Sequence, residues 1–257
     1  MSDGGPALYV YGVVRAPDAP QLDSLGVGDR GARLSDVVHG GVAAIVSEVD
    51  EGPLAAARDL RAHWRVLEDV AKRTTVVPVR FGTVMAGREE LVQEFLAPQA
   101  DSLAALLGEL DGRVQLSIKA FYDEERLLGE VVSGSPAVAQ LREKVKGMPE
   151  AAGYYERIRL GELVSGEVER CRERDTAAVL ARLEPLAVAA KNEDPGTADT
   201  AVNATFLVEE ERVAEFSKAV GQLTEELGER LRMRYLGPMP PYSFADADMA
   251  AGSGSWA

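Results

Sequence analysis

The segment Thr75-Val-Val-Pro-Val-Arg-Phe-Gly-Thr83 joins a β-branched run to an arginine, an aromatic ring and a glycine. Its proline has no backbone N–H to donate, so a strand that contains it belongs at a sheet edge or a bulge. A second segment, Gly237-Pro-Met-Pro-Pro-Tyr-Ser-Phe244, stiffens the backbone with prolines before two aromatic rings. Two rigid surface corners are therefore predicted. The alternative is an ordinary strand ending in a turn and a closing segment packed on the core.

Strands and helices alternate in the residues before and around the first segment. Residues 8–14 and 41–49 are rich in β-branched residues, and the stretch between them is interpreted as a long loop. A helix is expected from residue 54, with one apolar stripe at helical spacing. The stripe consists of Leu60, Trp64, Leu67 and Ala71. Apolar residues from 91 to 110 indicate another helical stretch, broken or kinked at Pro98.

Beyond Gly112 a new alternation begins, in which Val114 to Tyr122 has every second residue apolar. The same alternation predicts strands at 202–208 and 231–235. Helical spacing predicts helices at 138–146, 160–186 and 213–227, the longer one kinked or ended by Pro185. Residues 133–136 are expected to form a flexible loop and residues 192–196 a turn.

The order of these elements is typical of an α+β fold, with helices over one face of a mostly antiparallel sheet. We place a domain boundary near Gly112, which gives domains at 1–111 and 112–244. The tail 245–257 is small and polar and contains glycine, and disorder is expected there.

Composition restricts the classes of partner. The chain has 257 residues, and 42 acidic against 28 basic side chains give a formal net charge of −14. Such a charge repels phosphate backbones and anionic headgroups, so neither nucleic acid nor a membrane is an expected partner. The single cysteine, Cys171, forms no internal disulfide, and no export signal is recognisable. A cytoplasmic location is expected.

An enzyme is the main competing class of protein. The two histidines, His39 and His63, have no metal-ligand spacing to each other or to Cys171, so no metal is expected. No phosphate-loop or nucleophile-elbow motif is present, and no cofactor is predicted. The remaining alternative is a small-ligand-binding protein or enzyme that uses His63, Glu68 and Arg80. Helical spacing argues against it, because residues five apart on a helix point in different directions.

Several separated motifs carry a family resemblance. They are Tyr9-Val-Tyr-Gly12, His63-Trp-Arg-Val-Leu-Glu68, Tyr155-Glu-Arg-Ile-Arg-Leu-Gly161, Asn203-Ala-Thr-Phe-Leu207 and the two proline segments. In this order they resemble the gas vesicle protein F/L family over nearly the whole chain. One departure is Met239, which stands where the resemblance leads us to expect a bulky aromatic residue. An F-type and an L-type role are not separated by these motifs.

The resemblance implies a modified ferredoxin-like second domain with long helices and a separate α+β first domain. It also implies a non-enzymatic accessory protein of gas vesicle assembly, located in the cytoplasm and at the gas vesicle. The implied partners are the small hydrophobic shell subunit, protected from aggregation during nucleation, and other gas vesicle accessory proteins. Persistence as a minor vesicle component is a further implication. Strand addition and a helix laid in a groove both remain open as binding modes.

The two rigid corners are the hypothetical contact surface for the shell subunit, because their backbones are stiff and their turn residues are typical of exposed segments. The candidate partner-binding residues are Arg80, Phe81, Gly82, Pro240, Pro241, Tyr242 and Phe244.

Overall fold

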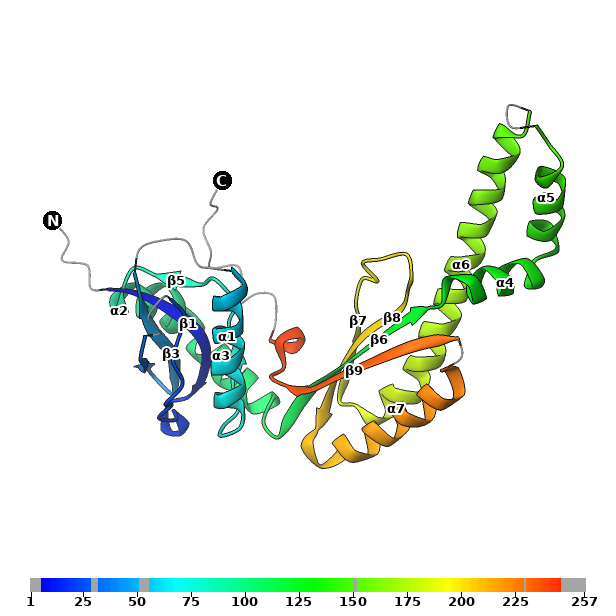
Figure 1. The fold of residues 1–257 in the computed structure, drawn as a ribbon. Coiled ribbons are helices and arrows are strands. Elements are labelled where there is room, and N and C mark those ends of the chain that lie inside the picture. The colour runs from blue at the N-terminus through cyan, green and yellow to red at the C-terminus, as the bar shows by residue number, and fades with distance from the viewer. Residues whose placement is uncertain (1–5, 29–31, 51–55, 150–151, 229, 246–257) are drawn as a thin grey trace. The chain divides into compact units, whose positions relative to one another are not determined.

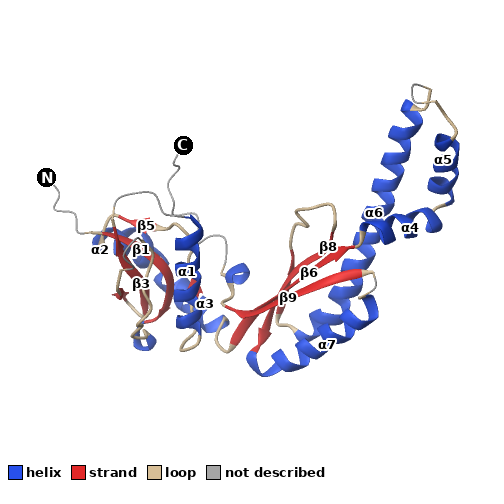
Figure 2. Cartoon of the chain, in the orientation of Figure 1, coloured by secondary structure: helices blue, strands red, loops and turns tan. Residues whose placement is uncertain are grey.

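The computed structural model describes residues 6–28, 32–50, 56–149, 152–228 and 230–245 (Figure 1). The chain divides into two compact units, an N-terminal unit up to Gln115 that also includes the chain from Pro238, and a C-terminal unit, Leu116–Gly237. Each unit combines helices with a sheet (Figure 2), which confirms the predicted α+β class.

The domain limits differ from those expected from sequence. Residues 238–244 were assigned to the second domain, but they belong to the N-terminal unit. The physical reason is aromatic packing, since the Tyr242 ring lies 4.4 Å from the Trp64 ring, centroid to centroid. Of the tail expected to be disordered, only Ala245 lies within the described residues.

The N-terminal sheet has the strand order β2-β3-β1-β4, with β5 also paired to β1. Its strands are β1 (Ala7–Arg15), β2 (Leu34–His39), β3 (Val42–Val49), β4 (Val77–Pro78) and β5 (Val84–Met85). Pro78 lies in the edge strand β4, as its missing N–H requires. The interpretation of residues between β1 and β3 as one long loop is wrong, because β2 lies there. Its only buried residue is Val37, which leaves an edge strand with little apolar signal.

Between β4 and β5 the chain leaves the ladder for the corner 80–82. The Val79 amide donates to the Tyr11 carbonyl at 2.9 Å, and the Val10 amide donates to the Thr83 carbonyl at 3.0 Å. Gly82 turns this corner with φ of 92°, a conformation that favours glycine. Both sides of the corner are thus tied to β1.

The N-terminal unit also contains helices and short helical turns. They are α1 (Ala56–Ala71), α2 (Arg88–Glu90), the π-helical η2 (Leu91–Leu96), α3 (Ala97–Glu109) and the 3₁₀ turns η1 (Ala16–Asp18) and η5 (Tyr242–Phe244). The predicted interruption at Pro98 is not a break in the helical run. Instead η2 precedes it, and Pro98 occupies the first turn of α3, where a backbone N–H is not needed.

The buried face of α1 follows the predicted apolar stripe only in part, since Leu67 of that stripe is fully buried and Leu60 is not. Leu60 is 40% exposed, whereas Asp59 and His63 are each 1% exposed. Val66 and Val70, which are fully buried, lie on the same face of the helix as Asp59 and His63. The stripe was predicted one position away from the true face because two of the inward-facing residues are polar.

The C-terminal sheet has the order β7-β8-β6-β9. Its strands are β6 (Arg113–Tyr122), β7 (Ala189–Asn192), β8 (Thr200–Glu209) and β9 (Leu231–Met239). Two helices complete a β-α-β-β-α-β arrangement, α6 (Tyr154–Leu183) before β7 and α7 (Val213–Leu227) before β9. This is the ferredoxin-like pattern that the resemblance implied.

Two further helices modify that pattern. The chain forms α4 (Glu124–Gly134) and α5 (Pro136–Lys146) between β6 and α6, and both contact α6 (Figure 1). The loop expected at 133–136 is therefore wrong, because only Ser135 separates the two helices. Pro136 starts α5, which is compatible with its fixed φ and missing N–H.

The remaining short elements are the 3₁₀ turns η3 (Glu184–Leu186) and η4 (Glu210–Arg212). α6 ends just before Pro185, as predicted. β7, in contrast, was not expected, and its side chains are half-buried or exposed because it is an edge strand.

Candidate functional site

The two proline segments meet on one histidine in the N-terminal unit. The His63 ring lies 5.7 Å from the Phe81 ring and 6.5 Å from the Tyr242 ring, measured between centroids. Phe81 and Tyr242 also pack against the main core cluster of this unit. Segments more than a hundred residues apart in sequence thus share one support.

The candidate residues differ in their access to solvent. Arg80 and Gly82 are exposed, Phe81 and Tyr242 are half-buried, and Pro240, Pro241 and Phe244 are buried. The closing segment is therefore largely a core element, as the structural alternative predicted. Only the corner 80–82 presents itself to solvent, and Val84 beside it in β5 is 44% exposed.

Buried hydrogen bonds hold the corner from beneath. The Gly82 amide donates to the Tyr9 hydroxyl at 3.0 Å, and this hydroxyl lies 2.9 Å from Nδ1 of His63. The simplest assignment lets Tyr9 donate to Nδ1, which leaves the proton of neutral His63 on Nε2. Burial lowers the pKa of His63 to about 4, so the ring is neutral near pH 7.

Two polar atoms of this cluster have no hydrogen-bond partner among the described residues. They are Nε2 of His63 and the hydroxyl of Tyr242, both buried. Burial also raises the pKa of Tyr242, so its hydroxyl stays protonated. Unpartnered buried groups weaken a fold, because each loses its bonds to water without replacement.

A second set of buried bonds ties the loop after β1 to the same helix. The Tyr11 hydroxyl accepts from the Val27 amide at 2.7 Å and lies 2.8 Å from Oγ of Ser47. Oδ1 of Asp59 accepts from the Gly28 amide at 3.1 Å. Sequence reasoning missed Asp59, Tyr11 and Ser47. The available signal was the spacing of Asp59 and His63, four residues apart and in register with Val66 and Val70.

The proposed catalytic set does not converge. His63 is buried, Glu68 and Arg80 are exposed, and no hydrogen bond or ion pair joins any two of them. Within the described ranges, no cluster of three or more histidine, cysteine, aspartate or glutamate side chains is placed to hold a metal ion. Across the same residues, no helix combines the length and the apolar character needed to cross a membrane.

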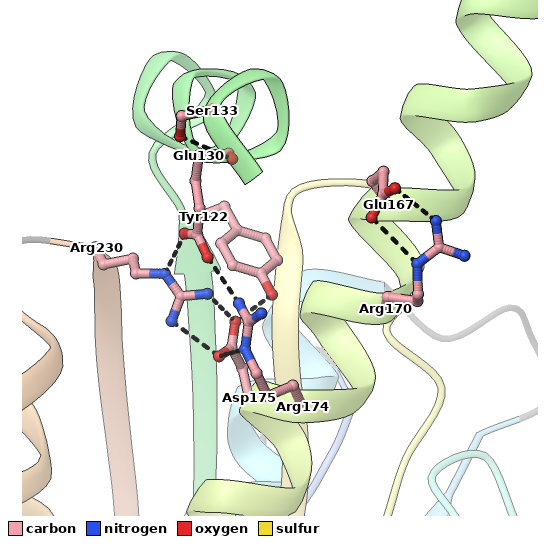
Figure 3. Close-up of polar contacts among 8 residues, drawn as sticks. All are labelled: Tyr122, Glu130, Ser133, Glu167, Arg170, Arg174, Asp175 and Arg230. Atoms are coloured by element: carbon pink, nitrogen blue, oxygen red, sulfur yellow. Dashed lines mark hydrogen bonds and ion pairs between the residues drawn. The ribbon is translucent and has the colours of Figure 1, made fainter. Parts of the chain in front are cut away.

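The C-terminal unit has its own buried polar centre, which we call the Asp175 network (Figure 3). Asp175 on α6 is 5% exposed and accepts two bonds from Arg230, at 2.8 and 2.6 Å. The Tyr122 hydroxyl donates to the same carboxylate at 2.6 Å. Nε of Arg230 donates to Glu130 at 2.6 Å, and Arg174 donates to Glu130 at 2.7 Å.

This network joins four segments of the C-terminal unit: β6, α4, α6 and the residue that precedes β9. Burial and the Asp175 charge raise the pKa of Tyr122, so it remains a hydrogen-bond donor. Hydrogen bonds to Asp175 and Glu130 raise the pKa of Arg230, although burial opposes this. Glu167 and Arg170 form a separate ion pair along α6, with 2.7 Å between the Arg170 nitrogen and the Glu167 oxygen (Figure 3). This pair is not part of the Asp175 network.

Fold and site together define a two-unit α+β protein, with a neutral aromatic centre under a sheet-edge corner and an ionic centre under a helical insertion. The chain belongs to the gas vesicle synthesis protein GvpL/GvpF family, whose model matches residues 7–246. This confirms the resemblance read from the motifs and places the chain among proteins of gas vesicle synthesis.

Individual relatives agree over nearly the full length. Gas vesicle protein F of Streptomyces sp. (strain CB03234) is 33% identical, with 93% of this chain and all of the relative covered. Gas vesicle protein F of Nostoc sp. (strain PCC 7120) is 32% identical and covers 95% of this chain and 99% of the relative. The crystal structure of GvpF from Anabaena sp. PCC7120 matches with a TM-score of 0.81 at 32% identity, covering 94% and 99% of the two chains.

Proposed function

We propose that the protein binds the hydrophobic shell subunit of the gas vesicle and keeps it from aggregating until it joins the growing shell. The observation that carries the proposal is the interrupted sheet edge formed by β4, the corner 80–82 and β5. There Arg80 and half-buried Phe81 lie in the corner between the two edge strands, and exposed Val84 lies in β5.

An edge of this kind suits a partner with unpaired strands. A subunit that polymerises through apolar faces and strand edges must cover them beforehand, because exposed edges pair indiscriminately. Adding a strand to β4 or β5 would satisfy the partner's backbone groups, and Phe81 and Val84 would contact its apolar side chains. The acidic remainder of the chain, with a net charge of −14, would keep the complex dispersed.

The backbone of the corner is also preorganised by hydrogen bonds in the unbound protein. Oγ1 of Thr83 donates to the Arg80 carbonyl at 2.8 Å, and Tyr9 holds the Gly82 amide from below. Because this backbone is already ordered, binding costs less conformational entropy than it would for a free loop.

Other parts of the proposal follow from the family. We infer a non-enzymatic role without a cofactor, exercised in the cytoplasm and at the gas vesicle, with other accessory proteins as additional partners. Persistence as a minor vesicle component belongs to the same proposal.

The test is co-expression of the shell subunit with the full chain or with the variant Val84→Glu. Two edge strands of one sheet offer a matched pair, since Val84 in β5 is 44% exposed and Val38 in β2 is 45% exposed. We expect Val84→Glu to reduce the co-purified, dispersed shell subunit by about tenfold, because a buried unpaired charge costs more than about 1.4 kcal/mol. Val38→Glu should leave it unchanged.

Equal effects of the two variants, or no effect of either, would contradict the proposal. Tyr242→Ala is a poorer probe, because Tyr242 packs on Trp64 and its truncation would disturb the core. The groove mode has a separate location, a cavity of about 770 Å³ between α4, α6 and the β7–β8 loop. Loss of binding with Leu128→Glu in that groove, and not with Val84→Glu, would select it instead.

A further inference from the structure

The C-terminal sheet has one face covered by helices and one face without them. On the covered face, Tyr122 bonds to Asp175 of α6, and Phe206 packs on Phe216 of α7 at 5.1 Å between ring centroids. Because side chains alternate along a strand, residues of opposite parity in β6 and β9 lie on the other face. We call this the open face. In the two neighbouring strands it carries Lys119, Phe121, Arg232, Arg234 and Leu236.

Positive charge gathers on the open face without compensation. The guanidinium carbons of Arg232 and Arg234 lie 5.5 and 5.2 Å from the centre of the Phe121 ring. Neither arginine, nor exposed Lys119, makes an ion pair or a hydrogen bond within the described part of the chain. The chain has 42 carboxylate side chains and only 28 basic ones, so three neighbouring cations without a paired carboxylate are unusual for this acidic protein.

Phe121 gives these arginines a fixed position. A guanidinium over an aromatic ring is held by the ring's negative face and still directs its N–H groups outward. The arrangement therefore offers planar donors in the geometry that carboxylates accept as paired hydrogen bonds.

The strand that carries both arginines, β9, is an edge strand of the sheet. β9 is the last strand in the order β7-β8-β6-β9, so one of its edges has no partner strand among the described residues. Leu236 on β9 is 50% exposed on the open face. Side chains of a strand alternate between its two faces, and both cations and the apolar side chain lie on one face beside an unpaired edge. They fit an extended peptide that presents acidic residues and then an apolar residue at alternate positions.

We propose that β9 and the open face bind an extended acidic segment of a partner protein by strand addition. Its carboxylates pair with Arg232 and Arg234, and an apolar side chain covers Leu236. This surface belongs to the C-terminal unit and is independent of the shell-subunit proposal, which concerns the edge of the N-terminal sheet.

Single-stranded nucleic acid is the competing anionic ligand for a sheet of this topology. Such sheets stack successive bases on several exposed rings. Here the open face of β6, β8 and β9 offers the Phe121 ring alone within the described residues, and guanidinium groups already lie over it. The net charge of −14 also opposes a ligand with a charge on every nucleotide. The observations favour the peptide.

Fluorescence anisotropy with the full chain tests the proposal. The probe is a labelled peptide about eight residues long, a typical strand length. It carries two glutamates and a valine at alternate positions, so that all three lie on the face of Arg232, Arg234 and Leu236. Three comparison ligands are the same peptide with lysine for glutamate, the same peptide with alternate N-methyl amides, and oligothymidylate of equal length. We expect saturable binding of the first peptide, and binding at least about tenfold weaker for every comparison ligand.

A paired variant isolates the arginines. Arg232→Ser with Arg234→Ser should weaken peptide binding by about tenfold or more, because two charge-assisted contacts are lost. Arg182→Ser with Arg212→Ser removes the same charge from exposed Arg182 on α6 and half-buried Arg212 on η4, and should change binding less than about twofold. Circular dichroism melting of each variant checks that the fold is kept.

Hydrogen exchange on the unmodified chain needs no variant at all. Strand addition should slow exchange of the β9 amides when the acidic peptide is bound, and should leave β7 unchanged. The proposal is overturned if the acidic peptide does not bind, if the N-methylated or lysine peptide binds as tightly, if oligothymidylate binds more tightly, or if the protection lies outside β9.

Discussion

The centre around His63 in the N-terminal unit and the centre around Asp175 in the C-terminal unit bury polar side chains in opposite ways. In the N-terminal unit the centre is neutral, built from Tyr9 and a deprotonated His63, and two of its atoms have no described partner. In the C-terminal unit the centre is ionic, and Asp175 accepts bonds from Arg230 and Tyr122. One centre supports an exposed corner, and the other anchors inserted helices.

The difference predicts what each centre tolerates. A buried ion pair contributes little in total, but removal of one partner leaves a charge in a poor solvent. A neutral hydrogen bond contributes about 1 kcal/mol, and loss of a partner costs less. Substitutions in the ionic centre should therefore lower the free energy of unfolding strongly, whereas the neutral centre should make the free energy of unfolding depend on pH.

The largest expected effect comes from Arg230→Met. It leaves Asp175 buried with Tyr122 as its remaining donor outside α6, and we expect the free energy of unfolding to fall by about 3 kcal/mol. Urea denaturation followed by far-ultraviolet circular dichroism measures this loss. Glu130→Gln removes a more exposed member of the network, whose side chain is 35% accessible, and should cost less than about 1 kcal/mol. Equal losses would show that the network is not centred on Asp175.

A pH effect follows from His63. In the unfolded chain its pKa has the ordinary value of 6.5, and in the native unit burial lowers it to about 4. Between these values the unfolded state binds the proton and the native state does not, so stability falls as the pH falls from 6.5 to 4. The total loss is about 3 kcal/mol, and above pH 6.5 it is absent.

The measurement is urea denaturation at a series of pH values, followed by Trp64 fluorescence in a Trp256→Phe background, which removes the second tryptophan of the chain. His63→Gln should flatten the pH dependence in this window, since glutamine does not titrate. If His63→Gln and the parent chain have the same slope, His63 is not buried in its neutral form.

The smallest effects come from two matched tyrosines of the neutral centre. Tyr9→Phe removes the hydroxyl that bonds Gly82 and His63, and should cost about 1–2 kcal/mol. Tyr242→Phe removes a buried hydroxyl without a described partner, and should be neutral or stabilising by up to about 1 kcal/mol. The same fluorescence titration compares them. A loss in Tyr242→Phe equal to that in Tyr9→Phe would mean that this hydroxyl is satisfied.

Much of the fold was predictable where side-chain periodicity matches burial. The strands β1 and β3 are buried nearly throughout, in agreement with their runs of β-branched residues, and the apolar residues expected in β8 and α7 are largely buried. The edge strands β2 and β7 were missed because an edge buries few side chains and has no apolar pattern.

The site was harder to predict than the fold. The proline segments were recognised as rigid, and both indeed pack around His63. Their exposure was not predictable, because proline stiffens a buried segment such as Pro240–Pro241 as readily as a surface one. The buried face of α1 was predicted one position away from the true one, because periodicity counts apolar residues and Asp59 and His63 on the true face are polar. The Asp175 network joins segments distant in sequence, and no local pattern signals it.

The most direct test of the account is amide hydrogen exchange on the chain alone and in its complex with the shell subunit, co-purified after co-expression. The two edges of the N-terminal sheet are then compared in one experiment. The account predicts slower exchange in residues 77–85, which form β4, the corner and β5, and unchanged exchange in β2. Protection of β2 instead, or no protection at either edge, would contradict it.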